Sequence, residues 1–241
     1  MTKKIYCPSM WKSVHIDTDG YLTPCCLFVK MEDKKTKITS VQNIGEVLHG
    51  EFSEYREQMN NGEWPRGCHQ CKFAEEEGRA SKREQDMWML TSGLMRSDPE
   101  NVQLEYLQLK TGRLCNLQCT ICTPACSTSI ATEQLKSGKL SRKMYDIYQQ
   151  DIAWSYDIKE YEKMTPPDSY FRIDIAGGEP LMNKTHFKWL DQLTNTKQTQ
   201  LLYNTNGTFR PTRDEINIGK KFRGIWMAFS IDSYGKKVEE L

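Results

Sequence analysis

The stretch LEYLQLKTGRLCNLQCTIC, residues 104–122, carries the strongest structural signal in the chain. Its first seven residues, 104–110, are rich in apolar side chains and predict a short strand. Cys115, Cys119 and Cys122 follow directly, with the spacing C-x3-C-x2-C. A strand that runs into a loop of three cysteines predicts a metal-binding loop at the carboxyl end of that strand.

Strands and helices alternate after this loop. We expect strands over residues 171–176, 200–203 and 224–231, and helices over residues 127–135, 184–193 and 212–220. Such alternation predicts an α/β fold with parallel strands and crossover helices, whose loops gather on one face where α/β proteins build active sites. Residues 139–167 fit as a helical insertion that carries no assignable motif.

The three cysteines of the loop suit an iron-sulfur cluster. Three thiolates can ligate three irons of a cubane, which leaves the fourth iron open to a ligand that is not protein. A structural zinc site normally has four ligands, and Cys126 could supply the fourth here, so zinc is the alternative.

A second group of cysteines lies near the N-terminus. Residues 14–26 predict two short strands around a turn at Asp19-Gly20, and residues 52–60 predict a helix that ends at Asn61-Gly62. Four cysteines surround these elements and offer one C-x2-C pair: Cys7, Cys25, Cys68 and Cys71. Their spacing suits a fully ligated [4Fe-4S] cluster or an all-cysteine zinc site equally. Cys26 could replace Cys25 as a ligand, whereas His69 is expected to be a loop side chain.

Composition narrows the function classes. The 241 residues hold 33 Lys plus Arg and 32 Asp plus Glu, without a long run of one sign, so neither nucleic acid nor a membrane is expected as a partner. We find no signal-peptide pattern and no apolar stretch of membrane-spanning length, and we expect a cytoplasmic protein. Nine cysteines in a reducing compartment indicate metal ligation or redox chemistry rather than disulfides.

These motifs resemble the radical S-adenosylmethionine (SAM) enzymes. In that family C-x3-C-x2-C follows the first strand of a partial (β/α)6 barrel, and the open iron of its [4Fe-4S] cluster binds SAM. Gly177-Gly178-Glu179-Pro180 after the second strand of the pattern is similar to the motif that holds the SAM amino group. Asn204, Ser230 and Asp232 end the next two strands and resemble positions that contact the SAM ribose and carboxylate. Position 121, commonly aromatic in the family, is Ile.

The N-terminal cysteines resemble a twitch or SPASM auxiliary-cluster domain, which would make Cys7, Cys25, Cys68 and Cys71 the ligands of a second [4Fe-4S] cluster. Such domains usually follow the barrel, whereas this one precedes it. The expected organisation is a cysteine-rich α+β auxiliary domain over residues 1–75, a linker over residues 76–103 and a radical SAM core over residues 104–241. With about four barrel strands present, the core is expected to be truncated, and its last strand to be an exposed edge.

The resemblance implies reductive cleavage of SAM to a 5′-deoxyadenosyl radical that abstracts a substrate hydrogen. It also implies an electron donor such as a flavodoxin or ferredoxin, and a peptide, protein or small-molecule substrate. No catalytic acid or base is assigned. Two alternatives stay open: a non-catalytic zinc- or iron-sulfur-binding interaction module, and a fragment that binds a cluster without turnover.

Overall fold

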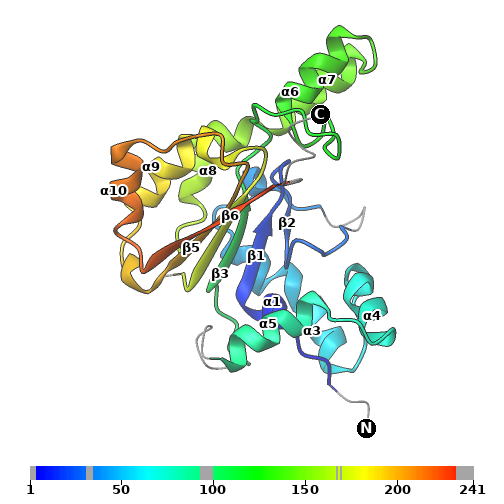
Figure 1. Ribbon diagram of the computed structural model, residues 1–241. Helices are drawn as coiled ribbons and strands as arrows, with labels where there is room; N and C mark the ends of the chain where they lie inside the picture. Colours follow the sequence, from blue (N-terminus) through cyan, green and yellow to red (C-terminus); the bar gives the residue numbers. More distant parts are fainter. Residues whose placement is uncertain (1–3, 31–34, 93–99, 167, 169, 232–241) are drawn as a thin grey trace, which may run out of the picture.

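A single mixed sheet organises the computed structural model, which describes residues 4–30, 35–92, 100–166, 168 and 170–231 (Figure 1). Its six strands lie in the order β2-β1-β3-β4-β5-β6, and every neighbouring pair is parallel except the β1–β2 hairpin. The strands are β1 (Ser13–Ile16), β2 (Leu22–Thr23), β3 (Tyr106–Lys110), β4 (Arg172–Ala176), β5 (Gln200–Thr205) and β6 (Gly224–Phe229).

Helices connect these strands. In chain order they are α1 (Pro8–Lys12), α2 (Gly45–His49), α3 (Glu51–Asn60), α4 (His69–Glu76), α5 (Lys82–Thr91), α6 (Thr128–Lys136), α7 (Arg142–Asp151), α8 (Ile158–Glu162), α9 (Thr185–Gln192) and α10 (Arg213–Gly219). Short 3-10 turns cover Ile38–Ser40, Arg66–Cys68, Ala153–Tyr156, Pro180–Met182 and Thr196–Gln198. None of the helices in the described part of the chain has the length and apolar character that crossing a bilayer requires.

The two faces of the sheet differ in chemistry. Side chains that alternate along β3, β4 and β5 are buried in the main hydrophobic core, among them Leu107, Ile173 and Leu201. Helices α8, α9 and α10 lie together on one side of the sheet, with the buried Trp189 of α9 in the same core (Figure 1). The intervening side chains, such as Gln108 and Asp174, therefore project from the opposite face, which is polar.

The N-terminal cysteine segment shares this sheet with the rest of the chain. Strand β1 pairs in parallel with β3, from Ser13 opposite Tyr106 to Ile16 opposite Leu109. Residues from both halves of the chain, including Trp11 and Leu48 as well as Leu109 and Trp189, form one continuous core. The expected linker, residues 76–103, contains helix α5, which packs beside α1. This helix was not foreseen, since its apolar residues do not follow a clear amphipathic pattern.

Most of the expected elements are confirmed within a few residues. The hairpin turn at Asp19-Gly20, the helix ending at Asn61-Gly62, the four strands β3 to β6 and the helical insertion are all present. Strand β6 is an exposed edge, as expected. Among the described residues the sheet is open, with β2 and β6 at its edges, so the partial barrel remains an expectation.

Candidate iron-sulfur sites

The topology places the two cysteine groups at opposite ends of the strands of the sheet. The loop with Cys115, Cys119 and Cys122 begins at the carboxyl end of β3. Cys7 precedes α1 and β1, and Cys25 follows β2, which runs antiparallel to β1, so both lie at the amino-terminal end of β1 and β3. Helices α6 and α7 beside the first group and α3 and α4 beside the second lie at opposite ends of the molecule (Figure 1).

The N-terminal group converges on one pocket. Cys7, Cys25, Cys68 and Cys71 all line a space of about 410 Å³, part of which is open to solvent. Three separate segments deliver them: the residue before α1, the loop after β2, and the 3-10 turn with the first turn of α4. Apolar side chains of Met10, Leu27, Phe28 and Met59 form much of the remaining wall. All four predicted ligands therefore share a single site.

The thiols of this pocket influence one another. Burial raises the pKa of Cys7 well above its usual value, and the charges of Cys25, Asp86 and Cys68 raise it further. Burial likewise raises the pKa of Cys25 to about 12, and raises that of Cys68 together with the charges of Cys25 and Cys71. Such thiols are neutral in an empty, apolar pocket, and they become thiolates when a positive ion replaces the proton.

The donor set fits an iron-sulfur cluster. It consists of four sulfur atoms, the ligand type that iron-sulfur cubanes take. No three His, Cys, Asp or Glu side chains among the described residues are grouped so as to hold a single metal ion. Cys26 is exposed and is not among the residues that line the pocket, and His69 lies with Nδ1 3.3 Å from the Arg66 carbonyl. The geometry thus favours Cys25 over Cys26 as a ligand.

The second cysteine group occupies an exposed loop. A backbone hydrogen bond of 3.0 Å from Cys122 to Cys119 closes its turn, and the Cys115 amide donates to Thr128 Oγ1 at 3.3 Å. Burial raises the pKa of Cys122, and the neighbouring charges of Cys126, Cys115 and Cys119 raise it further. The three predicted ligands are therefore neighbours. Cys126 also lies near Cys122. It therefore stays the candidate fourth ligand in the alternative in which this loop binds zinc.

The Gly-Gly-Glu-Pro segment packs directly on the strand end that leads into the cysteine loop. The Gly178 amide donates to the Gly112 carbonyl at 2.9 Å, and the Glu179 amide donates to the Leu114 carbonyl at 2.6 Å. A Cβ atom on Gly178 would lie 2.4 Å from the Leu114 oxygen. Gly177 has a φ of +133°, and a Cβ there would lie 2.8 Å from the Gly112 oxygen. Both glycines are thus required by close backbone contact.

Glu179 is buried within the protein, with 1% of its surface exposed. Its carboxylate accepts hydrogen bonds from the Leu181 amide at 3.1 Å, the Thr205 hydroxyl at 2.8 and 3.0 Å, and the Asn206 amide at 2.7 Å. Pro180 is also buried and starts the following 3-10 turn. Glu179 therefore ties the end of β4 to the end of β5, and its role toward SAM stays a prediction.

Asn206 was not among the predicted site residues, yet it reaches the cysteine loop. Its side-chain nitrogen lies 3.8 Å from the Cys115 sulfur and 3.1 Å from the Asn116 side-chain oxygen. Thr208 completes this network through the Asn116 and Asn206 side chains. In the sequence, Asn206-Gly207 has the character of an ordinary turn, so only the proximity of β5 to the loop identifies it. Asn204 and Ser230 are exposed on β5 and after β6, and Asp232 lies outside the described residues.

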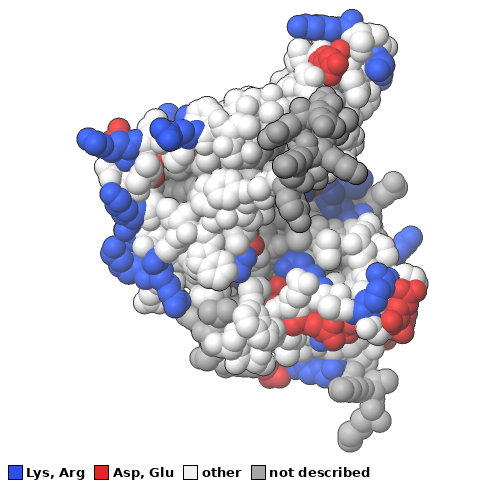
Figure 2. All heavy atoms as spheres, viewed as in Figure 1, with Lys and Arg blue, Asp and Glu red and all other residues white. Residues whose placement is uncertain are grey.

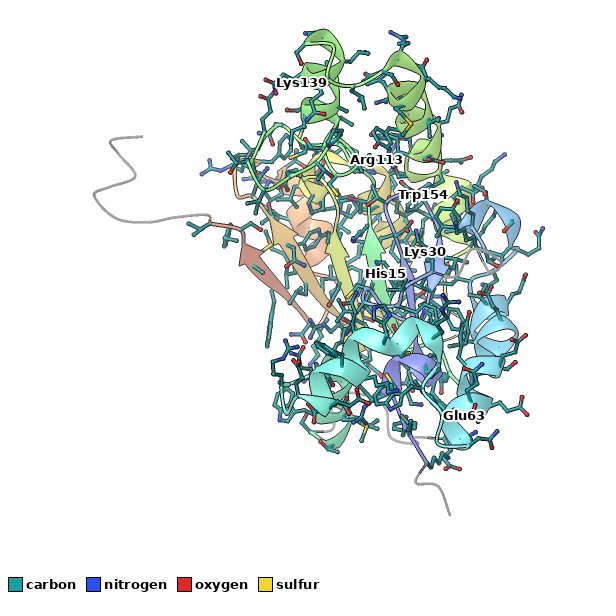
Figure 3. All side chains as sticks on the ribbon, turned by 90° about the vertical axis from the view of Figure 1, so that its right-hand side faces the viewer. His15, Lys30, Glu63, Arg113, Lys139 and Trp154 are labelled. Atoms are coloured by element: carbon teal, nitrogen blue, oxygen red, sulfur yellow. The ribbon has the colours of Figure 1, made fainter. Side chains whose placement is uncertain are left out.

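The helical insertion positions the start of the cysteine loop. Arg113 is buried and ion-pairs with Asp19 of the hairpin turn, and its Nη1 donates to the Tyr148 carbonyl at 2.7 Å. The Trp154 indole donates to the Thr18 carbonyl at 3.2 Å. Figure 3 shows Arg113 and, just below it, Trp154, both above His15 in that view. The insertion, the hairpin and the cysteine loop therefore form one connected structure.

A polar face lies between the two cysteine sites. The Tyr106 hydroxyl donates to Asp174 at 2.6 Å, Arg172 ion-pairs with Asp174, and the Gln108 amide donates to Ser13 at 3.0 Å. The Cys26 amide donates to Gln108 Oε1 at 3.4 Å, which links this face to the loop of Cys25. Figure 2 shows a hollow near the middle of the molecule with charged side chains at its wall. Tyr106 and Gln108 are buried on this face, whereas the side chains of Arg172 and Asp174 are partly exposed.

Comparison with known proteins bears on the first of the two sites. Residues 7–72 match the family model of the SPASM iron-sulfur cluster-binding domain. The matched segment contains Cys7, Cys25, Cys68 and Cys71, the four residues that line the pocket. Searches of curated proteins and of solved structures gave no significant match. The comparison therefore supports iron-sulfur binding by the N-terminal segment.

Proposed function

We propose that the chain is a radical SAM enzyme with an N-terminal auxiliary [4Fe-4S] cluster. The observation that carries the proposal is the convergence of Cys7, Cys25, Cys68 and Cys71 on one pocket within the SPASM match. The C-x3-C-x2-C loop lies at the opposite end of the strands of the same sheet. SPASM domains occur in radical SAM enzymes. A second cluster with an open iron at the loop of Cys115 completes the expected pair.

In this proposal Cys115, Cys119 and Cys122 hold the cluster that binds SAM, and that cluster supplies the electron for reductive cleavage of SAM when it is bound. Glu179 fixes the ends of β4 and β5 beside the loop, and Asn206 adds an amide group next to Cys115. Gly177, Gly178 and Asn204 border the space proposed for SAM, together with Ser230.

The substrate is proposed to lie over the polar face, between the two cysteine groups. That position brings a substrate next to the partly exposed Arg172 and Asp174, which the buried Tyr106 supports through its hydrogen bond to Asp174. A peptide or protein is the proposed substrate, with a small molecule as the alternative. The proposed electron donor is a flavodoxin or a ferredoxin. Exclusion of water from the space between the sites would protect a reactive intermediate.

The experiment that tests the proposal measures iron, acid-labile sulfide and zinc per chain after anaerobic reconstitution. We expect about eight irons in the wild type and about four in a Cys115→Ala, Cys119→Ala, Cys122→Ala variant, since each cubane holds four. Formation of 5′-deoxyadenosine from SAM by the wild type, and its loss in the variant, would then establish cleavage.

Other outcomes of this experiment would contradict the proposal. Stoichiometric zinc with little iron would identify a metal-stabilised interaction module instead. Two clusters without any 5′-deoxyadenosine would identify a cluster-binding chain that does not cleave SAM.

A further inference from the structure

Helix α5 completes the wall of the auxiliary pocket, although it lies outside the SPASM match. Lys82, Arg83 and Asp86 line the pocket together with the four cysteines, whereas the match ends at residue 72. The helix begins at a capping box in which Ser81 and Glu84 satisfy each other's backbone amides. Its first turn is thereby fixed against the cysteine site.

Asp86 and Lys82 form a shielded ion pair within this wall. The Lys82 ammonium lies 2.8 Å from Asp86 Oδ1, and the Ser9 hydroxyl donates to Asp86 Oδ2 at 2.5 Å. Only 14% of the Lys82 side chain and 1% of the Asp86 side chain are exposed. The Lys82 ammonium also lies 5.6 Å from the centre of the Tyr106 ring. Lys82 thus stands between the cysteine pocket and the polar face of the sheet.

The charges of this pair reach the thiols. Lys82 and Asp86 line the same pocket as Cys7 and Cys25, so both charges lie within the site that would hold the cluster. Burial would lower the pKa of Lys82 itself, but Asp86 outweighs this and the pKa lies above its usual value. The adjacent Arg83 also lines the pocket, where it ion-pairs with Glu75 at 2.5 Å and donates to the Tyr6 carbonyl at 3.0 Å.

We propose that Lys82 and Asp86 set the reduction potential of the auxiliary cluster. This inference rests on the proposed function, because it requires a cluster in the pocket. A cubane with four thiolates is negatively charged, and reduction adds one more negative charge. A shielded ammonium beside Cys25 stabilises the reduced state, and the carboxylate of Asp86 opposes it, because charges interact strongly where water is excluded. Lys82 is a positioning residue in this role and is not a ligand.

The test isolates the auxiliary cluster in the full-length Cys115→Ala, Cys119→Ala, Cys122→Ala variant and measures its midpoint potential by redox titration followed by EPR. We expect Lys82→Met to shift the potential to more negative values and Asp86→Asn to shift it to more positive values. Lys82→Arg keeps the charge and should stay close to the parent. Lys139→Met is the matched control, since Lys139 is exposed and lies at the far end of the molecule (Figure 3).

Iron content separates failure of this inference from failure of the proposed function. A parent variant that binds no cluster would overturn the proposed auxiliary site itself. A fully loaded Lys82→Met variant with the parent potential would overturn the role of Lys82 alone. If the Lys82→Met variant binds no cluster, the Asp86→Asn and Lys82→Arg variants decide. The inference fails if Asp86→Asn leaves the midpoint potential unchanged. It also fails if Lys82→Arg shifts the potential as far as Asp86→Asn does.

Discussion

Gly178 lies where the Gly-Gly-Glu-Pro segment packs against the start of the cysteine loop. A side chain at this position would push the segment and the loop apart. A Cβ atom there would lie 2.4 to 2.6 Å from backbone atoms of Arg113 and Leu114. Backbone atoms cannot relieve such a contact by a change of rotamer, as a side chain can. We expect Gly178→Ala to destabilise the protein by about 1–3 kcal/mol, as overpacking does, and to reduce loading of the Cys115 cluster. Iron content and chemical denaturation measure the two effects.

Gly224→Ala is the control for this substitution, because no atom lies within 4 Å of the Cβ position at Gly224. We expect it to leave cluster loading at the wild-type level. Equal iron loss in both variants would contradict the argument from close contact.

His186 gives the stability a defined pH dependence. The side chain is fully buried on α9, with Nε2 3.1 Å from the Tyr203 hydroxyl, and burial lowers its pKa to about 3. Unfolded chains take up a proton on this histidine below about pH 6.5, whereas the folded protein does not until about pH 3. The unfolded state therefore binds more protons within this window, and stability falls as the pH is lowered through it.

The His186→Gln variant removes this proton uptake. Between about pH 7 and about pH 5.5, we expect the wild type to lose about 1 kcal/mol more unfolding free energy than the variant. Urea denaturation at both pH values measures the difference, and the other buried histidine, His15, contributes to both proteins alike. Parallel pH profiles for the two proteins would show that His186 is not held neutral.

At the scale of elements, docking of the β1–β2 hairpin on the helical insertion depends on one turn residue. Gly20 has a φ of +82°, and a Cβ there would lie 2.9 Å from the Trp154 ring. Gly138 has a φ of +74°, with no atom within 4 Å of its Cβ position. Alanine should therefore cost about 1 kcal/mol of backbone strain at both positions, and the contact with Trp154 adds to it only at Gly20.

We expect Gly20→Ala to destabilise the protein by about 1 kcal/mol or more beyond Gly138→Ala. Thermal unfolding and the intrinsic tryptophan fluorescence of the two variants measure the difference. Equal melting temperatures would show that the turn and the Trp154 ring can move apart without cost.

The elements also show what the sequence could and could not predict. Strands β3 to β6 were predictable because each is a short apolar run bounded by turn residues, and the turn at Asp19-Gly20 because it needs a positive φ. Pairing of β1 with β3 was not predictable, since it joins strands about ninety residues apart through long-range packing alone. The same holds for Asn206 and for Lys82, whose roles depend on neighbours that are distant in sequence.

At the scale of the whole molecule, the two cysteine sites differ in how they connect to the core. Cys7 belongs to the main hydrophobic core, and Cys25 and Cys68 pack against it. Cys115, Cys119 and Cys122 lie on a loop beside the exposed Ile121. A group that binds the native state alone stabilises it by mass action. A cluster bound to the N-terminal cysteines therefore links three segments of the core. A cluster bound to Cys115, Cys119 and Cys122 links residues of one loop only.

We therefore expect reconstitution to raise the melting temperature of the protein mainly through the auxiliary site. The readout is the difference in melting temperature between the reconstituted and the apo form of each variant, which cancels the effect of the substitutions on the apo protein. A Cys115→Ser, Cys119→Ser variant should keep a rise of at least about 5 °C, which corresponds to roughly 1–3 kcal/mol for a chain of this size. A Cys7→Ser, Cys68→Ser variant should lose most of it. A rise that disappears in the first variant and persists in the second would place the stabilising metal at the exposed loop, and would contradict the connection between the N-terminal cysteines and the core.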